Sequence, residues 1–285
     1  MRKLVIAEKP SVARDIARVL KCNKRGEGYS LESYNNISGS GFDVKMGLIL
    51  RPFEYSPFRI GFAVHTPTFY KLTYSTSAIV TNDYRDAKTD ELKRIIVDTY
   101  DYVGDMKRDY RLVTPWKYNV SLGYTVGTSL ALGAEYEYED YSSVKFRYPE
   151  GDKMEFETNA AKMVMKGVNT FRIGAEYKVI PQFAFRLGYN YSSSIFKNGA
   201  IKYLPYNSVN TDTDFANSKS LSNYTLGIGY RGTMIYADLA YKFSSYKEDF
   251  YPFYNEFNDR GIVTPNVTKI TNTRSQVLFT LGMRF

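Results

Sequence analysis

The chain has 285 residues, a formal net charge of +8 and 16% aromatic residues, with 27 Tyr and 18 Phe against one Trp. Its single cysteine, Cys22, excludes an internal disulfide and a zinc site built from cysteines. With one histidine, His65, we expect neither His/Cys metal chemistry nor a serine-histidine-aspartate triad, and we assign His65 a structural role. No run of about eighteen apolar residues occurs, so no transmembrane helix is expected.

The positive charge is concentrated at one end. Residues 1–29 hold eight basic and three acidic side chains, a net +5, which leaves +3 for the remaining chain. Because the basic character is local, it does not predict nucleic-acid binding by the whole chain. We expect no nucleic-acid partner, no metal and no cofactor.

The first 29 residues are patterned as a β–loop–α segment. Leu4–Ala7 is typical of a short buried strand, and Ser11 can cap a following helix with apolar residues at helical spacing. The segment is a poor secretory signal, because Glu8, Lys9 and Pro10 interrupt its apolar run after four residues.

This opening, MRKLVIAEKPSVARDIARVLKCNKRGEGY, resembles the start of bacterial type IA DNA topoisomerases of the topoisomerase III kind, at the head of their Toprim domain. The resemblance implies that Glu8 lies near the metal and the scissile phosphate, with Lys9 in the same site. However, no Asp-x-Asp metal motif follows in a suitable αβ context, and 29 residues cannot bury a Toprim core. Glu8 and Lys9 are therefore the only catalytic candidates, and we expect no enzyme activity.

From about Ser30 the apolar residues alternate with polar ones at period two, which predicts β-strands. We expect loops at 82–107, with a possible helix at Asp90–Asp98, and at Tyr148–Lys166, Lys197–Ser220 and Tyr246–Asn272. The expected strands are Phe42–Leu50, Phe58–Val64 continuing toward Val80, Tyr110–Tyr124, Ser129–Phe146, Phe171–Lys178, Phe183–Ser192, Leu226–Arg231, Ile235–Phe243 and Val277–Phe285.

The clearest of these patterns is the hairpin Tyr118–Asp140. Along its second arm Leu130, Leu132 and further apolar or aromatic residues form one face, and small or acidic residues form the other. A tight turn at Thr125–Thr128 containing Gly127 joins the arms. Taken alone, this hairpin is compatible with a half-buried hairpin of a soluble β-protein or with two strands of a membrane barrel.

The connections decide between these alternatives, because short turns and long loops alternate along the chain. Outer-membrane barrels have this asymmetry, and their strands carry one continuously apolar face toward lipid. The sequence therefore predicts an all-β protein, an antiparallel transmembrane β-barrel of about ten strands, preceded by the short β–loop–α segment.

Three segments carry a family resemblance: GFDVKMGLILRPFEYSPFRIGFAVHTPTFY, RLVTPWKYNVSLGYTVGTSLALGAEYEYEDYSSVKF and NTFRIGAEYKVIPQFAFRLGYNYSSS. They resemble outer-membrane transporters of the FadL/TodX family over about residues 34–285. The resemblance implies a monomeric barrel for passive uptake of hydrophobic compounds such as long-chain fatty acids or aromatic hydrocarbons. The family has fourteen strands and an N-terminal hatch, so we expect this chain to hold only the last ten strands. We expect two domains, 1–29 and 30–285, joined by a fusion near Tyr29/Ser30.

The polar face of the strands should line the barrel lumen. A hydrated, charge-paired interior is the simpler interpretation of these residues, and a patch for a substrate carboxylate is the alternative. Trp116 is expected to anchor the membrane interface. The expected lumen-lining residues are Glu135, Glu137, Glu139, Arg172, Glu176, Lys178, Arg186, Arg231, Asp238, Lys242 and Arg284.

The expected partners follow from the barrel. They are outer-membrane lipid, hydrophobic small molecules and the barrel-assembly machinery, which would engage the C-terminal strand ending at Phe285. We expect a monomer in the outer membrane, although no signal peptide is recognisable. The alternative is a type IA topoisomerase fragment acting in DNA strand passage or relaxation, which we expect to be inactive.

Overall fold

The computed structural model describes residues 28–104, 106–201, 214–252, 256–258, 261–263 and 266–283. The strand and helix expected within residues 1–27 lie outside these ranges. The chain divides into two compact units: one contains Thr73–Arg108 and the residues up to Ser38, and the other contains Gly39–Leu72, Asp109–Pro205 and Asp212–Phe285. The boundary expected between residues 29 and 30 stays a prediction.

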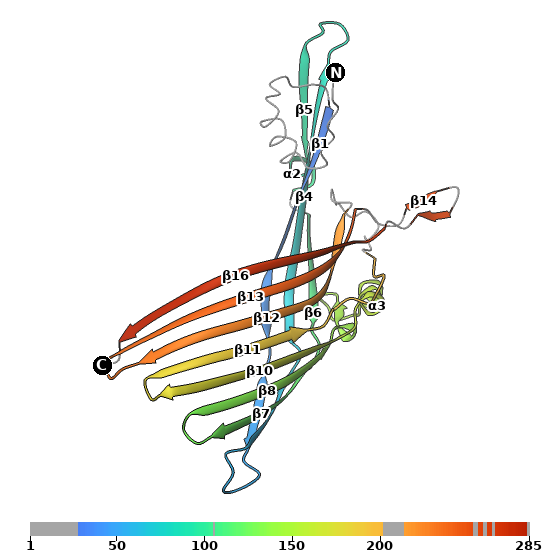
Figure 1. The fold of residues 1–285 in the computed structure, drawn as a ribbon. Helices are drawn as coiled ribbons and strands as arrows, with labels where there is room; N and C mark the ends of the chain where they lie inside the picture. Colours follow the sequence, from blue (N-terminus) through green and yellow to red (C-terminus); the bar gives the residue numbers. More distant parts are fainter. Residues whose placement is uncertain are drawn as a thin grey trace. The chain divides into compact units, whose positions relative to one another are not determined.

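The second unit contains an antiparallel sheet in which nine strands of the described residues pair (Figure 1). In spatial order the strands are β2 (Lys45–Leu50), β3 (Arg59–His65), β7 (Lys117–Val126), β8 (Leu130–Asp140), β10 (Gly167–Ile180), β11 (Phe183–Ser192), β12 (Phe215–Arg231), β13 (Ile235–Tyr251) and β16 (Thr268–Met283). Each strand of this sheet pairs with its neighbour along the order in antiparallel fashion. The predicted all-β, antiparallel architecture is confirmed.

The connections within this sheet alternate between short and long, as predicted. The short ones are 51–58, 127–129, 181–182 and 232–234, and the long ones are 66–116, 141–166, 193–214 and 252–267. In the short connection after β7, Gly127 has a φ of 54°, a left-handed conformation that glycine adopts without steric cost. Because neighbouring strands are antiparallel, all short connections lie at one end of the sheet, the turn end, and all long ones at the other, the loop end.

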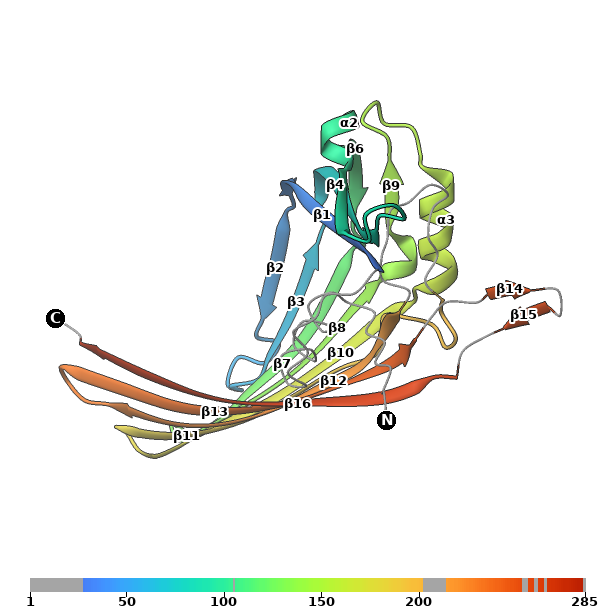
Figure 2. The ribbon, with the colours of Figure 1, turned by 90° about the horizontal axis from the view of Figure 1, so that it is seen from above.

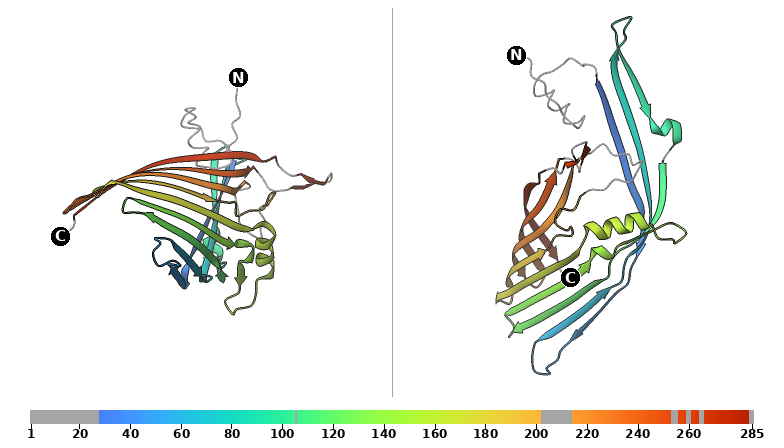
Figure 3. Two further views of the ribbon diagram at one scale, coloured as in Figure 1. Left: turned by 60° about the horizontal axis from the view of Figure 1, so that its bottom comes forward. Right: turned by 90° about the vertical axis from the view of Figure 1, so that its right-hand side faces the viewer.

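The sheet is curved across its strands (Figures 2 and 3). Among the described residues, β2 and β16 are the two ends of its order. β2 has 6 residues and β16 has 16, so the two edges differ in length. A closed barrel and its strand number therefore stay predictions.

A second sheet has the order β1-β4-β6-β9, and β5 also pairs with β4. β1, β4 and β6 each have residues in both units. In the second unit, β6 pairs with β9, with Arg111 opposite Arg147. The strands are β1 (Gly28–Phe42), β4 (Phe69–Arg85), β5 (Leu92–Asp98), β6 (Met106–Val113) and β9 (Lys145–Arg147); β14 (Glu256–Asn258) and β15 (Gly261–Val263) form a separate hairpin.

The helix expected at Asp90–Asp98 was wrong, because this segment forms β5 and pairs with β4 in the first unit. Three consecutive β-branched residues, Ile95, Ile96 and Val97, favour the strand. The Arg94 guanidinium donates two hydrogen bonds to the Asp83 carboxylate, at 2.6 and 2.8 Å, directly across the strand pair. A short helix, α2 (Thr99–Val103), follows β5.

The loop expected at Tyr148–Lys166 contains a helix, α3 (Glu155–Val164). Met154 and Ala161 are buried there, together with Val144, next to the 3-10 turn η1 (Tyr141–Ser143). Thr158 is also buried, and its hydroxyl accepts a hydrogen bond from the Phe146 amide at 3.0 Å. This small core fixes α3 against β9 in the second unit.

Among the helices of the described residues, none is long and apolar enough to cross a membrane.

Candidate functional site

The nine-stranded sheet has two chemically different faces. In the register of β8 and β10, Arg172 lies opposite Glu135 and Ile173 lies opposite Ala134. Successive residues of a strand point to opposite faces, so this register collects apolar side chains on one face, the apolar face, and charged ones on the other, the polar face. The same alternation continues in β11, where Arg186 and Leu187 lie on opposite faces.

A first charge cluster lies on the polar face toward the loop end. The Arg172 guanidinium pairs with the Glu135 carboxylate, and its Nη1 also lies 3.2 Å from Glu137 Oε2. The Lys117 ammonium lies 3.6 Å from Glu137 Oε1 and 3.3 Å from Glu139 Oε2. Three carboxylates thus share two cations across β7, β8 and β10. We call these five residues the loop-end cluster.

A second cluster lies on the same face toward the turn end. Arg186 Nε donates to Glu176 Oε2 at 2.7 Å, and Arg186 Nη1 donates to Asp238 Oδ1 at 2.6 Å. The Lys178 ammonium lies 4.0 Å from Glu176 Oε1. These four residues, the turn-end cluster, come from β10, β11 and β13, so Arg186 ties together strands that are not adjacent in the sheet.

Between the two clusters the polar face carries no side chains on four neighbouring strands. Gly123, Gly133, Gly174 and Gly188 lie directly opposite one another along β7, β8, β10 and β11. A Cβ placed on Gly133 would have nothing within 4 Å. Glycine inside a strand often marks a place where another group approaches the backbone closely. At Gly123, Gly133 and Gly174 this glycine row leaves an open band between the two charged layers, whereas the Thr225 side chain occupies the space at Gly188.

The structure places the predicted lumen residues as follows. Glu135, Glu137, Glu139 and Arg172 fall in the loop-end cluster, and Glu176, Lys178, Arg186 and Asp238 fall in the turn-end cluster. Arg231 and Lys242 lie on β12 and β13, outside both clusters, and Glu8, Lys9, Arg284 and Phe285 lie outside the described residues. That this face lines a lumen stays a prediction.

Sequence reasoning missed Lys117, the second cation of the loop-end cluster. Its signal was present, because Lys117 has the same parity as Asn119 and Ser121 on the polar arm of the hairpin. It lies within the expected strand Tyr110–Tyr124, one residue before the hairpin Tyr118–Asp140, and β7 begins at this lysine.

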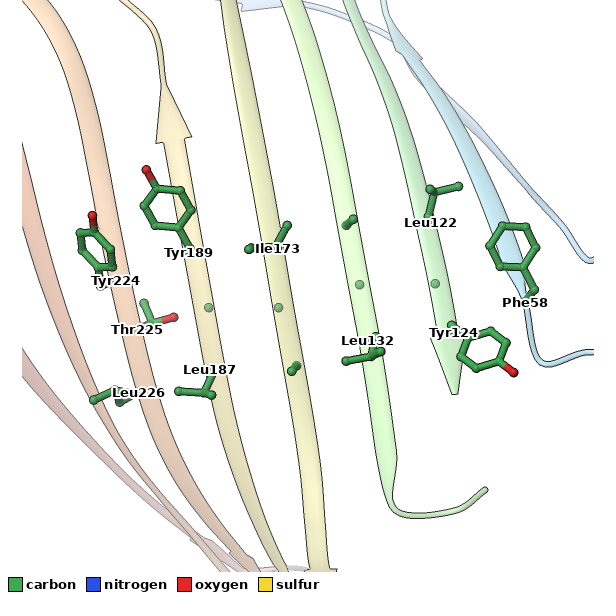
Figure 4. A pocket seen from close by; sticks show the side chains of 16 residues that line it. Phe58, Leu122, Tyr124, Leu132, Ile173, Leu187, Tyr189, Tyr224, Thr225 and Leu226 are labelled. Atoms are coloured by element: carbon green, nitrogen blue, oxygen red, sulfur yellow. The ribbon is translucent and has the colours of Figure 1, made fainter. Parts of the chain in front are cut away.

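The apolar face carries a shallow pocket of about 600 Å³ that spans β7, β8, β10, β11 and β12 (Figure 4). Its lining includes the small side chains of Ala134 and Ala175 and the four glycines of the row. Leu122, Ile173 and Leu226 are among the larger side chains around it, and each remains about half exposed. The pocket is open and lined almost entirely by carbon, so it suits an acyl chain or another apolar group.

Comparisons with known proteins give two unrelated likenesses, and no protein-family model matches the chain. DNA topoisomerase 3 of Bacillus thuringiensis (strain Al Hakam) and that of Bacillus anthracis are each 79% identical to it over 28 residues, which are 10% of this chain and 4% of theirs. DNA topoisomerase 3 of Shouchella clausii is 51% identical over 47 residues, 16% of this chain and 6% of its own. The short resemblance to topoisomerase III is thus confirmed, over a small part of either protein.

Among solved structures, the crystal structure of a Pseudomonas aeruginosa FadL homologue aligns with 90% of this chain. The identity is 16% and the TM-score 0.41, and the chain spans 64% of that protein's length.

Proposed function

We propose that the nine-stranded sheet is part of the wall of an outer-membrane β-barrel that admits hydrophobic compounds. The observation that carries the proposal is the exposed apolar face. Val277 is 70% exposed and Phe279 68% exposed on β16, and Ile173 is 58% exposed in the middle of the sheet. A soluble protein buries the apolar face of a sheet against another layer, whereas a barrel wall turns it toward lipid.

The opposite face supports the same orientation. Nine of its charged side chains are gathered in the two clusters, as suits the polar, hydrated interior of a barrel. A soluble sheet would present such charges to bulk water and keep its leucines inside. The separation of long and short connections to opposite ends of the sheet adds a second feature of outer-membrane barrels.

The class of compound comes from the resemblance of three strand segments to FadL/TodX transporters. On that basis we propose long-chain fatty acids or aromatic hydrocarbons as substrates, taken up passively by a monomer. The barrel-assembly machinery is the proposed partner during insertion. The glycine row supports passage of an apolar molecule, because it widens the space over the polar face between the two charged layers.

Uptake tests the proposal directly. Fluorescent fatty acid and a fluorescent sugar of similar size are supplied to liposomes that contain the refolded full-length chain. We expect saturable entry of the fatty acid and no entry of the sugar, and a mobility on electrophoresis that changes after boiling. Equal entry of both compounds would indicate a general pore, and a chain that stays in solution without detergent would contradict the membrane placement.

The topoisomerase likeness does not lead us to propose an activity on DNA, because it covers 4% of the Bacillus thuringiensis enzyme. We propose that the chain is not an enzyme. Relaxation of supercoiled DNA by the purified protein with Mg²⁺, lost on Glu8→Ala, would contradict this.

A further inference from the structure

A second pocket of the second unit has a different chemistry from the sheet's apolar face. It encloses about 490 Å³ between the start of β4, β6, β9 and the segment before β7. Its side chains include four cations and two large exposed aromatic residues, and no acidic residue lines it. The cations are Lys71, Arg111, Lys145 and Arg147, and the exposed aromatics are Phe69 and Trp116.

The two arginines of this pocket face each other in an arrangement that is electrostatically unfavourable. Arg111 of β6 lies directly opposite Arg147 of β9, and Lys145 lies opposite Val113 two residues further along. Side chains directly opposite one another in an antiparallel pair have their Cβ atoms about 5 Å apart, and like charges at that distance destabilise the sheet. The arrangement is explained if an anion lies between the guanidinium groups.

The backbone around the pocket fixes these side chains. Arg147 Nη1 donates a hydrogen bond to the Gly151 carbonyl at 2.9 Å, which orients the guanidinium. The Thr68 amide donates to Thr114 Oγ1 at 2.8 Å, which ties the start of β4 to the end of β6. Among the described residues, no carboxylate forms a salt bridge with Lys71, Arg111 or Lys145.

We propose that this pocket binds a phosphate monoester carried on an apolar or aromatic group. Four cations without an acidic neighbour match a doubly charged phosphate better than a single carboxylate. Arginine forks bind phosphate oxygens in pairs, which suits the opposed Arg111 and Arg147. Phe69 and Trp116 offer apolar surface beside the charge, so the group that carries the phosphate contacts them. The inference does not depend on transport.

Trp116 provides the measurement, because it is the single tryptophan of the chain. The full-length protein in a non-ionic detergent is titrated with dodecyl phosphate, dodecanoate and inorganic phosphate while tryptophan emission is recorded. We expect a saturable change with dodecyl phosphate, at a concentration about tenfold below that needed for dodecanoate or inorganic phosphate.

The decisive variant is Arg111→Gln/Arg147→Gln, and the matched control is Arg51→Gln, which removes an exposed arginine from the short connection between β2 and β3. We expect the double variant to weaken dodecyl phosphate binding about a hundredfold and the control to leave it unchanged. Unchanged binding in the double variant, or equal affinity for dodecanoate, would overturn the proposal. If the double variant does not fold, Lys145→Gln serves in its place, with at least a severalfold loss expected.

Nanodiscs with and without phosphatidic acid distinguish a phosphate on a lipid headgroup from a phosphate on a soluble ester. If phosphatidic acid in the disc shifts the emission and blocks added dodecyl phosphate, the ligand is a lipid headgroup. If dodecyl phosphate binds equally in discs with and without phosphatidic acid, the ligand is a soluble ester. Failure of both to bind would overturn the proposal, whatever the outcome of the uptake experiment.

Discussion

Arg172 is the side chain on which the loop-end cluster depends, since it contacts Glu135 and Glu137 from β10. Replacing it with methionine leaves Glu135 without a cation of the cluster, and leaves Glu137 with Lys117 alone. We expect Arg172→Met to lower the free energy of unfolding by about 1–2 kcal/mol, a value reduced by the partial exposure of these groups to water. The midpoint of urea unfolding of the liposome-inserted protein measures it.

The control for this variant removes both the positive charge of Arg172 and the negative charge of Glu135. Arg172→Met/Glu135→Gln should recover part of the loss, because fewer negative charges then remain without a cation. An equal loss in the single and the double variant would show that Arg172 acts through packing of its aliphatic stem and not through its charge.

Arg111 gives the opposite expectation for stability. Because it faces Arg147 across the strand pair, Arg111→Gln should raise the melting temperature in the absence of anions, corresponding to roughly 0.5 kcal/mol. The gain should disappear when dodecyl phosphate is present, since the ligand stabilises the unsubstituted protein more than the variant. A calorimetric scan with and without the ester measures both effects, and a lower melting temperature without the ester would contradict the repulsion.

At the scale of single residues, the sequence predicts which side chains share a face but not which ones pair. Arg186 and Asp238 are 52 positions apart, and their contact depends on the register of β11, β12 and β13. The cationic pocket was not predicted, because Lys71, Arg111 and Lys145 come from three separate segments with no shared motif. Only the pairing of β6 with both β4 and β9 makes them neighbours.

Two glycines in strands give contrasting expectations at the scale of the element. Gly133 has open space around its Cα, so Gly133→Ala should leave stability nearly unchanged. Gly39 has a φ of 154°, and a Cβ there would collide with the backbone carbonyl of Lys71, so Gly39→Ala should cost more than about 2 kcal/mol. Thermal melts followed by circular dichroism compare the two variants. Equal melting temperatures would contradict the pairing of β1 with β4 at Gly39.

The tip of the β4–β5 hairpin gives a prediction about pH. The Lys93 ammonium and the amides of Lys88 and Thr89 donate to the Asp86 carboxylate and hold its pKa below the ordinary value of 3.8. The stabilisation is present above that value and is lost as the pH falls through the lowered pKa. A carbon-13 NMR titration should show Lys93→Gln raising the pKa of Asp86, and an unchanged value would contradict the contact.

Strands were predicted correctly where apolar and polar residues alternate without interruption. The strand and helix within the long connections were not. The alternation in β10 and β11 predicted both strands and the short turn between them. In β5 the sequence LKRIIVD has no clean alternation, so the local pattern could not exclude a helix. The helix α3 follows a polar stretch, and its burial against η1 and β9 is a tertiary effect that no local pattern contains.

For the molecule as a whole, the central prediction is which face meets lipid. Leu122 and Ser121 are neighbours in the middle of β7 and point to opposite faces. We expect Leu122→Arg to cost about 2–4 kcal/mol of folding stability in liposomes, while Ser121→Arg, opposite Glu135, is tolerated. Unfolding in liposomes of matched thickness measures both. Equal tolerance of the two substitutions would show that the apolar face is not in contact with lipid.

Short turns were enough to predict four pairings of this sheet, and the other four join strands across the long connections. What joins β2 and β16 could not be predicted, since both are edges whose partners depend on segments distant in sequence. In lipid, both edges need partners for their backbone hydrogen-bonding groups.

The glycine row also has a mechanical consequence. When a sheet bends toward one face, the side chains of neighbouring strands on that face are pressed together, and their volume resists the bend. Gly123, Gly133, Gly174 and Gly188 have no side chains to press, while the charged clusters above and below them are cross-linked. The row is thus the line across these four strands at which side chains on the polar face resist bending of the sheet least.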